Sequence, residues 1–469
     1  MRLMSLVVVA CMVVPARAES PAPLARQVGT IVGAAYEGSA LELLTDLSDK
    51  VGARLTGTKG YAAGVAWAMQ ALRAAGATDV HVEKVRMPAT WDRGTASGRL
   101  VGASARRLVV ESFGWAPSTP AGGITAPVVV IDNPDRSRWS ALPLKGAIVV
   151  ITGGATKPPG WTMQAIPALA KLGVRAAVFA LAPLANGVTP KSGWHGIIAE
   201  MPIVMLGRED GAYITRHAAD GLRMELVVTN KVGPAADVDN VIGEIKGSDP
   251  TAGWLLASAH LDSWDGATGT QDNGSGVVTV IETARALASA GGLKRTVRFA
   301  LWAGEEQADQ GSRAYTAAHA AELASCVAVL NTDGGAGHVI GWTTTGRDDV
   351  QSAFKPVADA YLTALGGADV STVWLGGSDH DAFVIAGVPV LDLNTEEEPY
   401  YKIHHKLGDT IDKVDPHKFA SGIAVFAATT YVLAMSTTRL GPQLGHDAIE
   451  AVLVKNGTIE FARALGWWK

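Results

Sequence analysis

The sequence predicts an α/β fold, a three-layer αβα sandwich built on a largely parallel mixed sheet, with a β-rich domain inserted into it. In the second half of the chain, apolar runs typical of buried strands alternate with segments of helical spacing, which favours parallel strands with helices on both faces. Short β-rich runs separated by Pro and Gly dominate residues 107–232. The length of 469 residues suits two domains, or one large domain with an insertion.

The first part of the main domain is predicted to span residues 19–106. Helical spacing occurs at Leu24–Ala35 and at Leu41–Val51. A loop punctuated by glycines then leads to an amphipathic helix over Tyr61–Ala75. Alternating apolar residues over Val80–Met87 predict a strand, so this part supplies helices and one strand of the main sandwich.

The inserted region, residues 107–232, contains short predicted strands and one predicted helix, Met163–Leu172. It holds no cluster of histidines and carboxylates, so the sequence favours a structural role for it, as a lid or a dimerisation element. The predicted strands are Val128–Ile131, Ala147–Ile151, Ala176–Phe179, Ile203–Leu206 and Arg223–Val228.

The second part of the main domain, residues 233–469, is expected to contain the functional site. Its strands alternate with helices, of which Gly276–Ala290 is the clearest, and this order predicts a largely parallel sheet. The predicted strands are Asp239–Ile245, Trp254–Ala259, Thr296–Trp302, Val327–Leu330 and Val388–Leu393.

Composition excludes several classes of protein. Hydrophobic residues make up 48% of the chain and charged residues 18%, which is typical of a globular protein and not of a disordered one. The formal net charge of -5 comes without a basic cluster, so neither nucleic acid nor an anionic membrane is an expected partner.

The N-terminus resembles an export signal. Arg2, an apolar run and the small residues of Ala16–Ala18 predict a signal peptide over residues 1–18, and hence an exported, periplasmic or secreted protein. Lipidation at Cys11 is the alternative, because Val8–Cys11 is similar to a bacterial lipobox. Removal of the signal leaves one cysteine, Cys326, so no intramolecular disulfide forms. No later apolar run is expected to span a membrane.

Histidines and carboxylates follow the predicted strands at their ends. Each such residue alone is more often a capping or hydrogen-bonded group, but the pattern recurs along the chain. In open α/β sheets, sites form in the crevice at the carboxyl ends of strands. The residues concerned are His260 and Asp262, Asp272, the pair Glu305–Glu306, Asp333, and the pair His404–His405.

Mixed histidine and carboxylate ligands suit zinc. Five ligands of this kind are too many for one tetrahedral site, and they suit two metal ions about 3.5–4 Å apart with one bridging carboxylate. The five candidates are His260, Asp272, Glu306, Asp333 and His405. A pair of this kind lowers the pKa of a shared water to about 7 and clamps both oxygens of a tetrahedral intermediate. Glu305, left free beside its neighbour, is placed to act as general base and then as acid. This arrangement indicates hydrolysis of an amide.

The ordered set of motifs resembles the co-catalytic zinc exopeptidases, the superfamily of aminopeptidase Y and glutamate carboxypeptidase, and most of all its carboxypeptidase Q branch. The likeness extends over most of the mature chain, and the whole set is far more specific than any member. The motifs are Arg54–Gly57, Asn240–Gly243, His260–Asp265, Asp272–Gly276, Leu301–Gln307, His404–His405 and Gly408–Thr410.

The resemblance implies a zinc-exopeptidase fold and two zinc ions. His260 and Asp333 would bind one ion, Glu306 and His405 would bind the other, and Asp272 would bridge them. His405 is preferred to its neighbour because it lies four residues before an aspartate, Asp409, which is the family's spacing.

The resemblance also implies roles around the metals. Glu305 would be the general base, and Asp262 would be the carboxylate that orients the first histidine. Ser378, Asp379 and His380 resemble the family's loop near the substrate, where His380 would contact the developing oxyanion or a substrate terminus. The insertion resembles a protease-associated domain, on segments Leu144–Val149 and Leu172–Ala177, and a homodimer is expected.

The leading hypothesis is therefore a di-zinc exopeptidase that cleaves dipeptides or short peptides, similar to a carboxypeptidase Q-type dipeptidase. A broad-specificity aminopeptidase with the same metal site is the alternative within the enzymes. A non-catalytic binding ectodomain is less favoured, because every ligand position and Glu305 carry competent residues. A one-zinc enzyme of the glutaminyl cyclase type is less favoured too, because the motif His260–Trp264 and the long inserted domain fit it poorly.

Overall fold

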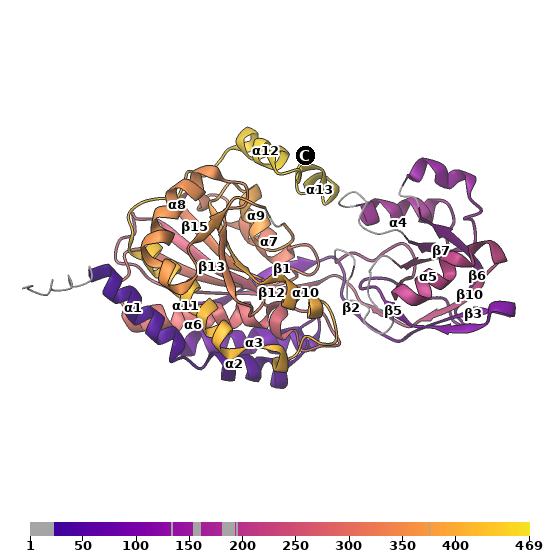
Figure 1. The fold of residues 1–469 in the computed structure, drawn as a ribbon, viewed down its shortest axis with the longest axis horizontal. Helices are drawn as coiled ribbons and strands as arrows, with labels where there is room; N and C mark the ends of the chain where they lie inside the picture. The colour runs from indigo at the N-terminus through magenta and orange to yellow at the C-terminus, as the bar shows by residue number, and fades with distance from the viewer. Residues whose placement is uncertain (1–22, 133–134, 153–160, 181–192, 194–195, 375) are drawn as a thin grey trace, which may run out of the picture.

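The computed structural model describes residues 23–132, 135–152, 161–180, 193, 196–374 and 376–469, without the side chains of residues 23, 162 and 163. The predicted signal peptide, residues 1–18, and Cys11 lie outside the described residues. The described chain forms a larger lobe and a smaller lobe, each built on its own sheet (Figure 1).

The sheet of the larger lobe is mixed. Its four central strands, β14, β13, β15 and β18, run parallel to one another, so their carboxyl ends meet at one edge. Antiparallel pairs flank this centre on both sides. In order across the sheet the strands are β1 (Thr78–Met87), β12 (Ala236–Ile245), β14 (Thr296–Trp302), β13 (Trp254–His260), β15 (Cys326–Thr332), β18 (Val390–Thr395), β16 (Val339–Thr343) and β17 (Asp369–Ser371).

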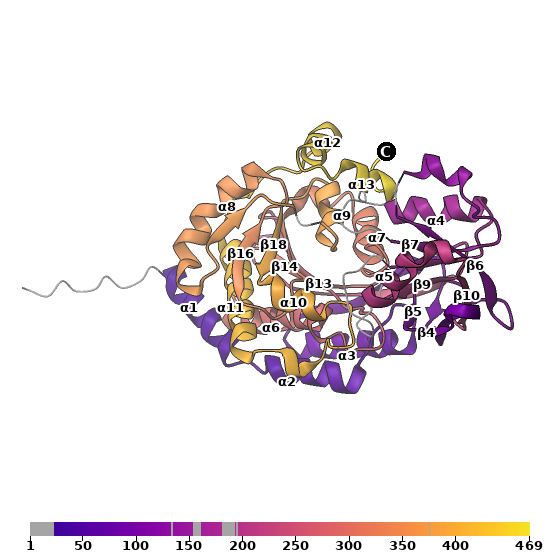
Figure 2. The ribbon, with the colours of Figure 1, turned by 45° about the vertical axis from the view of Figure 1, so that its right-hand side comes forward.

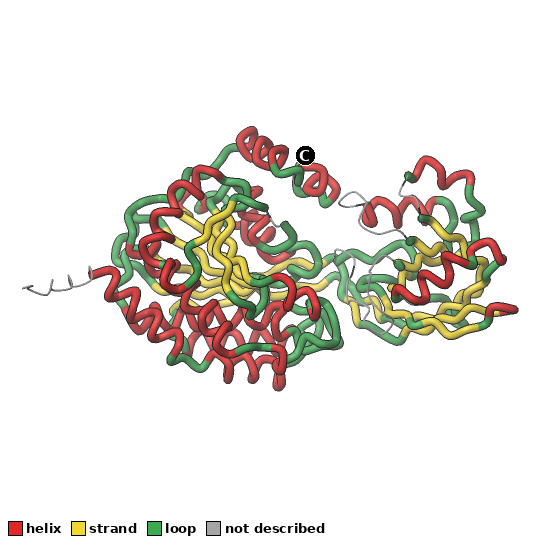
Figure 3. Tube along the Cα trace, in the orientation of Figure 1, coloured by secondary structure: helices red, strands yellow, loops and turns green. Residues whose placement is uncertain are grey.

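Helices cover both faces of this sheet, which confirms the predicted three-layer sandwich (Figure 3). One face carries α1 (Pro23–Tyr36), α2 (Ala40–Asp46), α3 (Lys59–Ala74), α6 (Ser275–Ala290) and α11 (Pro416–Met435). The other face carries α7 (Gln310–Ala318) and α9 (His380–Ile385), and α8 (Asp348–Tyr361) packs at the β17 edge. Outside the layers lie α10 (Glu397–Ile403), α12 (His446–Lys455) and α13 (Ile459–Ala464).

The central strands form where the sequence has unbroken apolar runs. Every residue of β13 and β15 is buried, as a strand covered on both faces requires. Polar caps fix several helix starts: the Thr58 side chain accepts a hydrogen bond from the Tyr61 N–H at the start of α3, and Asp415 caps α11. The strand centres are therefore rigid supports for the residues that follow them.

Among the described residues, one helix, α11, is long and apolar enough to cross a membrane by length and composition. No such run was expected from the sequence. In the structure 72% of the most apolar stretch of α11 is buried, and the helix packs against α1 and α6. Its apolar surface is thus used inside the larger lobe.

The smaller lobe is built on the second sheet, which contains the strands predicted for the inserted region. Its strands in order are β4 (Arg106–Leu108), β3 (Ala96–Val101), β10 (Arg223–Val228), β6 (Ile124–Ile131), β7 (Ile148–Ile151), β8 (Ala176–Phe179), β9 (Ile203–Leu206) and β5 (Val110–Ser112). Helices α4 (Trp161–Lys171) and α5 (Arg208–Arg216) accompany it (Figure 2). Strand β2 (Trp91–Asp92), which lies between the lobes in Figure 1, pairs with β11 (Lys231–Val232).

Strand β3 pairs with β10, so strands of the second sheet begin before residue 107, the boundary expected from the sequence. Only alternate residues of β3 are buried, and the strand contains Gly98, so it lacks the apolar run on which the boundary was placed. The division of the chain into domains stays a prediction.

Candidate metal centre

Three of the predicted site residues meet at the carboxyl ends of neighbouring parallel strands. His260 is the last residue of β13, and Asp333 directly follows β15. The His260 Nε2 atom lies 3.0 Å from Asp333 Oδ1 and 3.3 Å from Asp272 Oδ1. One ligand atom of each residue lies within 4.8 Å of the others, so the three side chains form one group that could hold a metal ion.

The second oxygen of Asp272 faces a different pair. His405 Nε2 lies 3.2 Å from Asp272 Oδ2 and 2.9 Å from Glu306 Oε2. Asp272 precedes α6, Glu306 follows β14, and His405 follows α10, so three separate segments converge here. One carboxylate thus contacts two groups, one through each oxygen.

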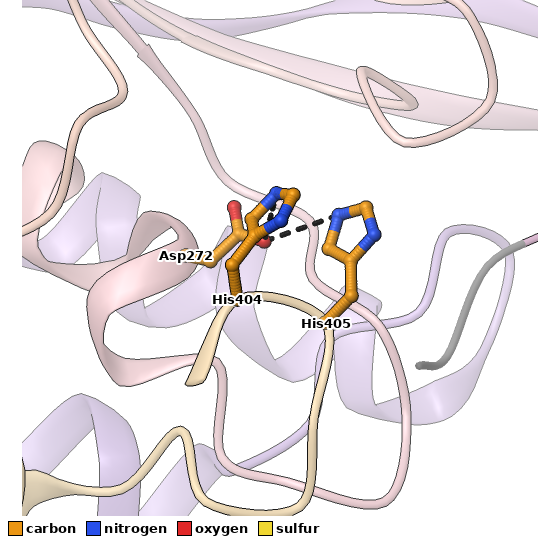
Figure 4. Close-up of side chains that lie close together, drawn as sticks. All are labelled: Asp272, His404 and His405. Atoms are coloured by element: carbon orange, nitrogen blue, oxygen red, sulfur yellow. Dashed lines mark ion pairs between the residues drawn. The ribbon is translucent and has the colours of Figure 1, made fainter. Parts of the chain in front are cut away.

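His404 also points to Asp272, with its Nε2 3.5 Å from Oδ2 (Figure 4). Its ring stacks on that of His405 at a centroid distance of 3.8 Å. Of the two, His405 makes the additional ion pair with Glu306. His405 has a φ of 57°, in the left-handed region that costs a non-glycine residue about 1–2 kcal/mol. The surrounding packing therefore holds a histidine in a backbone conformation that glycine usually adopts.

The carboxylates of the centre are buried without a Lys or Arg partner among the contacts that the structure describes. Burial raises the pKa of Glu306 to about 7, although the neighbouring His405 acts to lower it. One oxygen of Glu306 is buried with no hydrogen-bond partner. Burial also acts to raise the pKa of Asp272, but hydrogen bonds with His260 and His405 hold it well below its usual range. Buried carboxylates and imidazoles whose described ion pairs include no Lys or Arg fit a divalent metal of the zinc type.

The adjacent glutamates diverge. Glu305 Oε2 lies 3.9 Å from His260 Nε2, whereas Glu306 turns to His405. The Glu305 side chain is 11% exposed and lines a cavity. Burial raises its pKa well above the usual range, and His260 opposes that shift. Glu305 is thus a carboxyl group at the cavity surface, beside the metal-type cluster and outside it.

Asp262 was expected to orient His260 through its carboxylate, but the hydrogen bond runs to its backbone. His260 Nδ1 lies 3.1 Å from the Asp262 carbonyl oxygen, while the nearest carboxylate oxygen is 3.6 Å away. The carboxylate instead accepts the backbone N–H groups of Glu305 and Glu306, at 3.2 and 3.4 Å, and the Thr56 hydroxyl at 2.9 Å. Asp262 therefore positions both the imidazole and the glutamate pair.

Asp409 positions backbone, not a histidine ring. Its carboxylate accepts the N–H groups of Gln271 and Asp272, at 2.7 and 3.1 Å. Burial raises the pKa of Asp409 to about 7. Asp409 thus fixes the segment that carries the shared carboxylate.

Arg54 makes a second backbone clamp. Its fully buried guanidinium donates to the carbonyl oxygens of Leu261, Thr268 and Gly269, and burial lowers its pKa to about 10. These carbonyls belong to the loop between His260 and Asp272. The cation therefore ties the loop together without forming an ion pair with the cluster.

Two cavities of about 260 Å³ each flank the centre, and Asp333, Gly377 and His404 line both. The one we term the strand-side cavity is also lined by Gly334, Gly376, Ser378, His380, Asp392, Leu393, Asn394, Thr395, Glu397, Tyr400 and Tyr401. The one we term the helix-side cavity is also lined by Gly193, Asp272, Glu305, Glu306, Ala308, Asp309, His405, Phe461, Leu465 and Trp467.

The three predicted substrate contacts are placed differently. Ser378 and His380 line the strand-side cavity. Asp379 is fully buried and lines neither cavity, so the structure gives it no access to a substrate. The physical reason is local: the chain turns into α9 at this point, and the Asp379 side chain enters the protein interior.

Aromatic contacts connect the smaller lobe to the centre. Trp264 packs against His405 at a centroid distance of 6.0 Å and against Trp115 at 6.2 Å. Arg93 forms a bidentate pair with Asp265, the residue next to Trp264. The motif that begins at His260 therefore carries a lobe contact as well as site residues.

Comparison with known proteins shows similarity to a family of peptidases. The model of peptidase family M28 matches residues 240–430. Carboxypeptidase Q of Mus musculus is 31% identical over 411 residues, which cover 85% of this chain and 86% of that protein. The chain belongs to peptidase family M28. It is therefore a peptidase and a hydrolase, as its sequence predicted.

Two further M28-type likenesses cover nearly the whole chain. A probable lipoprotein aminopeptidase, LpqL of Mycobacterium tuberculosis, is 28% identical over 468 residues, with 91% of this chain and 89% of that protein covered. The solved structure of a peptidase M28 precursor from Shewanella amazonensis is 27% identical, with a TM-score of 0.79 over 90% of this chain and 99% of that chain. The fold of this M28 chain is thus that of its family.

Sequence reasoning missed the residues that support the centre. Arg54 and Thr56 stood in a motif without an assigned role, and Asp409 served only to choose between the two histidines. Phe461 and Leu465 were not singled out at all, because they lie on a short helix far along the chain from every motif. A buried arginine between loops is visible only once the fold brings those loops together.

Proposed function

We propose that this M28 peptidase is a two-zinc exopeptidase that hydrolyses dipeptides or short peptides. The observation that carries the proposal is the position of Asp272, whose two oxygens face separate groups. His260 and Asp333 would hold one ion, Glu306 and His405 the other. Such a shared carboxylate is what a two-metal hydrolase requires.

Bound zinc supplies a Lewis acid and lowers the pKa of a water molecule to about 7. The chain's own residues do the rest. Glu305 accepts the proton of the attacking water at its carboxylate and then donates it to the leaving nitrogen. The Asp262 carboxylate accepts a hydrogen bond from the Glu305 backbone N–H and so keeps Glu305 in place.

A dipeptidase of the carboxypeptidase Q type is the leading assignment, since carboxypeptidase Q is the name of the relative that is 31% identical. A broad aminopeptidase is the second candidate. No Lys or Arg is among the described residues that line the two cavities, whereas Asp309, Asp392 and Glu397 are. Acidic walls attract a free α-ammonium group and repel a free carboxylate, and LpqL carries the name aminopeptidase.

The experiment is hydrolysis of a panel by the full mature chain: free dipeptides, N-blocked dipeptides and aminoacyl p-nitroanilides, each with and without a chelator. Cleavage of free dipeptides alone, lost on chelation and restored by zinc, supports the dipeptidase. Strong cleavage of the p-nitroanilides supports the aminopeptidase. Two bound zinc ions without any cleavage contradict both peptidase assignments and favour the non-catalytic binding ectodomain. One bound ion points to the glutaminyl cyclase-type enzyme.

Export and a homodimer remain proposals. The A-x-A signal supports signal-peptidase cleavage, and the lipoprotein name of LpqL supports the alternative, lipidation at Cys11. Mass spectrometry of the mature N-terminus separates these two outcomes. Light scattering of the purified chain measures whether it is a dimer.

A further inference from the structure

The two cavities beside the centre differ in the chemistry of their walls. The strand-side cavity is polar, with carboxylates, an amide and tyrosines around it. The helix-side cavity has one apolar wall, made by Phe461, Leu465 and Trp467. Its other non-ionisable lining residues are small, namely Gly193, Gly377 and Ala308. Large apolar surface in the described lining therefore comes from one place, α13 and the turn after it.

The apolar wall is firmly held. Leu453, Ala462 and Trp468 form a small buried core together with neighbours from the two C-terminal helices. Phe461 packs edge-on against Trp467 at a centroid distance of 5.9 Å, and the Arg313 guanidinium of α7 lies 5.4 Å from the Trp467 ring. Figures 1 and 2 show α12 and α13 as one yellow unit on the α9 side of the larger lobe. The wall is thus a built surface, fixed to both α7 and α12.

The helix-side cavity also reaches the reacting groups, because Glu305 and Asp272 line it. Its volume of about 260 Å³ is just below the range of typical ligand cavities, about 300–1,000 Å³, so its occupant is small. A single amino-acid residue in it would lie between α13 on one side and Glu305 and Asp272 on the other.

We propose that α13 is the element that selects the substrate side chain: Phe461, Leu465 and Trp467 form a subsite for a large apolar residue, such as leucine or phenylalanine, at one position of the dipeptide. This inference rests on the proposed exopeptidase function and adds its specificity. The three residues lie beyond residue 430, where the match to the M28 model ends, so the subsite is a property of this chain's C-terminal segment.

The test measures hydrolysis of two dipeptide series, X-Ala and Ala-X, in which X is Gly, Leu or Phe. The full wild-type chain is compared with the variants Leu465→Ala and Phe461→Ala. The wild type is expected to prefer Leu over Gly in one series only. Each variant should reduce that preference by about tenfold or more, as loss of pocket methylenes does, while kcat/KM for the Gly peptide changes little. Leu465→Met, which keeps the volume, should retain the preference. Val454→Ala, an exposed apolar residue of α12, is the matched control.

A binding measurement separates this inference from the proposed function. Calorimetry with free L-leucine and glycine should show tighter binding of leucine to the wild type, and Leu465→Ala should remove the difference. Should no peptide be cleaved, the proposed function fails, and the leucine measurement alone decides the subsite. Equal binding of leucine and glycine by the wild type, or an unchanged preference in both variants, overturns the subsite. Retained cleavage of the Gly peptide shows that a variant is folded.

Discussion

The two sheets of this molecule share a design and differ in chemistry. Each contains four neighbouring parallel strands, β14-β13-β15-β18 in the first and β6-β7-β8-β9 in the second. Strands β7, β8 and β9 are as fully buried as β13 and β15. Among the described residues, metal-type groups of histidine and carboxylate occur only at the first sheet.

Buried carboxylates beside the two sheets differ in the residues that balance their charge. Asp210, next to the second sheet, accepts from the Arg106 guanidinium at 2.8 Å and from the Val109 N–H at 2.9 Å, so its charge is balanced inside the protein. Asp272 and Glu306, beside the first sheet, have histidines and no Lys or Arg among their described ion pairs. The parallel edge provides a place for a site, and carboxylates paired with histidines instead of an arginine fit that site to a metal.

The largest expected effect is at Glu305. Replacing it with Gln should reduce kcat by about 10²–10⁴-fold, because the amide cannot take up the proton, while zinc content stays at the wild-type level. Peptide hydrolysis and metal analysis by mass spectrometry measure the two quantities on one sample. Glu83→Gln, a carboxylate of β1 outside the centre, is the control. Substantial turnover in Glu305→Gln would mean that another group is the base.

Asp272→Ala removes the carboxylate shared by both groups. Metal content should fall from two ions to less than one per chain, and activity should fall with it, because each remaining group is left with two of its protein ligands. Metal analysis after dialysis against zinc-free buffer gives the number. If the variant retains two ions, Asp272 is not the bridge.

The mirror experiment is Asp210→Asn beside the second sheet. This change leaves Arg106 without its anionic partner and should lower the free energy of unfolding by about 1–3 kcal/mol. Zinc content and peptide hydrolysis should not change. Thermal unfolding and metal analysis, compared with Asp272→Ala, therefore separate a structural charge from a functional one. A loss of metal in Asp210→Asn would break that separation.

The smallest effect is expected at Cys326, at the amino end of the strand whose carboxyl end leads to Asp333. Burial raises the pKa of this thiol well above its usual range, so it stays neutral and unreactive at pH 8. Iodoacetamide should label it slowly in the native protein and quickly in urea, and Cys326→Ser should keep full activity. Fast native labelling, or a large loss of activity, would show a role for the thiol.

The parts of the fold that the sequence predicted are those with a strong local pattern. Strands β13 and β15 are continuous apolar runs, and α3 has clear helical spacing. Helix α11 escaped prediction because it is buried almost all round, which removes the polar face that marks an amphipathic helix. Strand β3 is short and half-exposed, so its pairing with β10 depends on long-range contacts.

The candidate site divides in the same way. Residues that supply an ionisable side chain at a strand end, such as His260 and Glu306, were predictable because their chemical type and position are both written in the sequence. The supports were not. Asp409 binds backbone N–H groups, which every residue possesses, so no sequence pattern identifies its partner. Leu465 reaches the helix-side cavity only through tertiary packing.

The most direct test of the metal centre is a zinc titration of the chelator-stripped wild-type chain, with binding and dipeptide hydrolysis followed together. Two zinc ions per chain, with activity complete at the second, are the expected result, because one carboxylate joins two ligand groups. Saturation at one ion with full activity, or activity that does not depend on zinc, would contradict the two-metal centre.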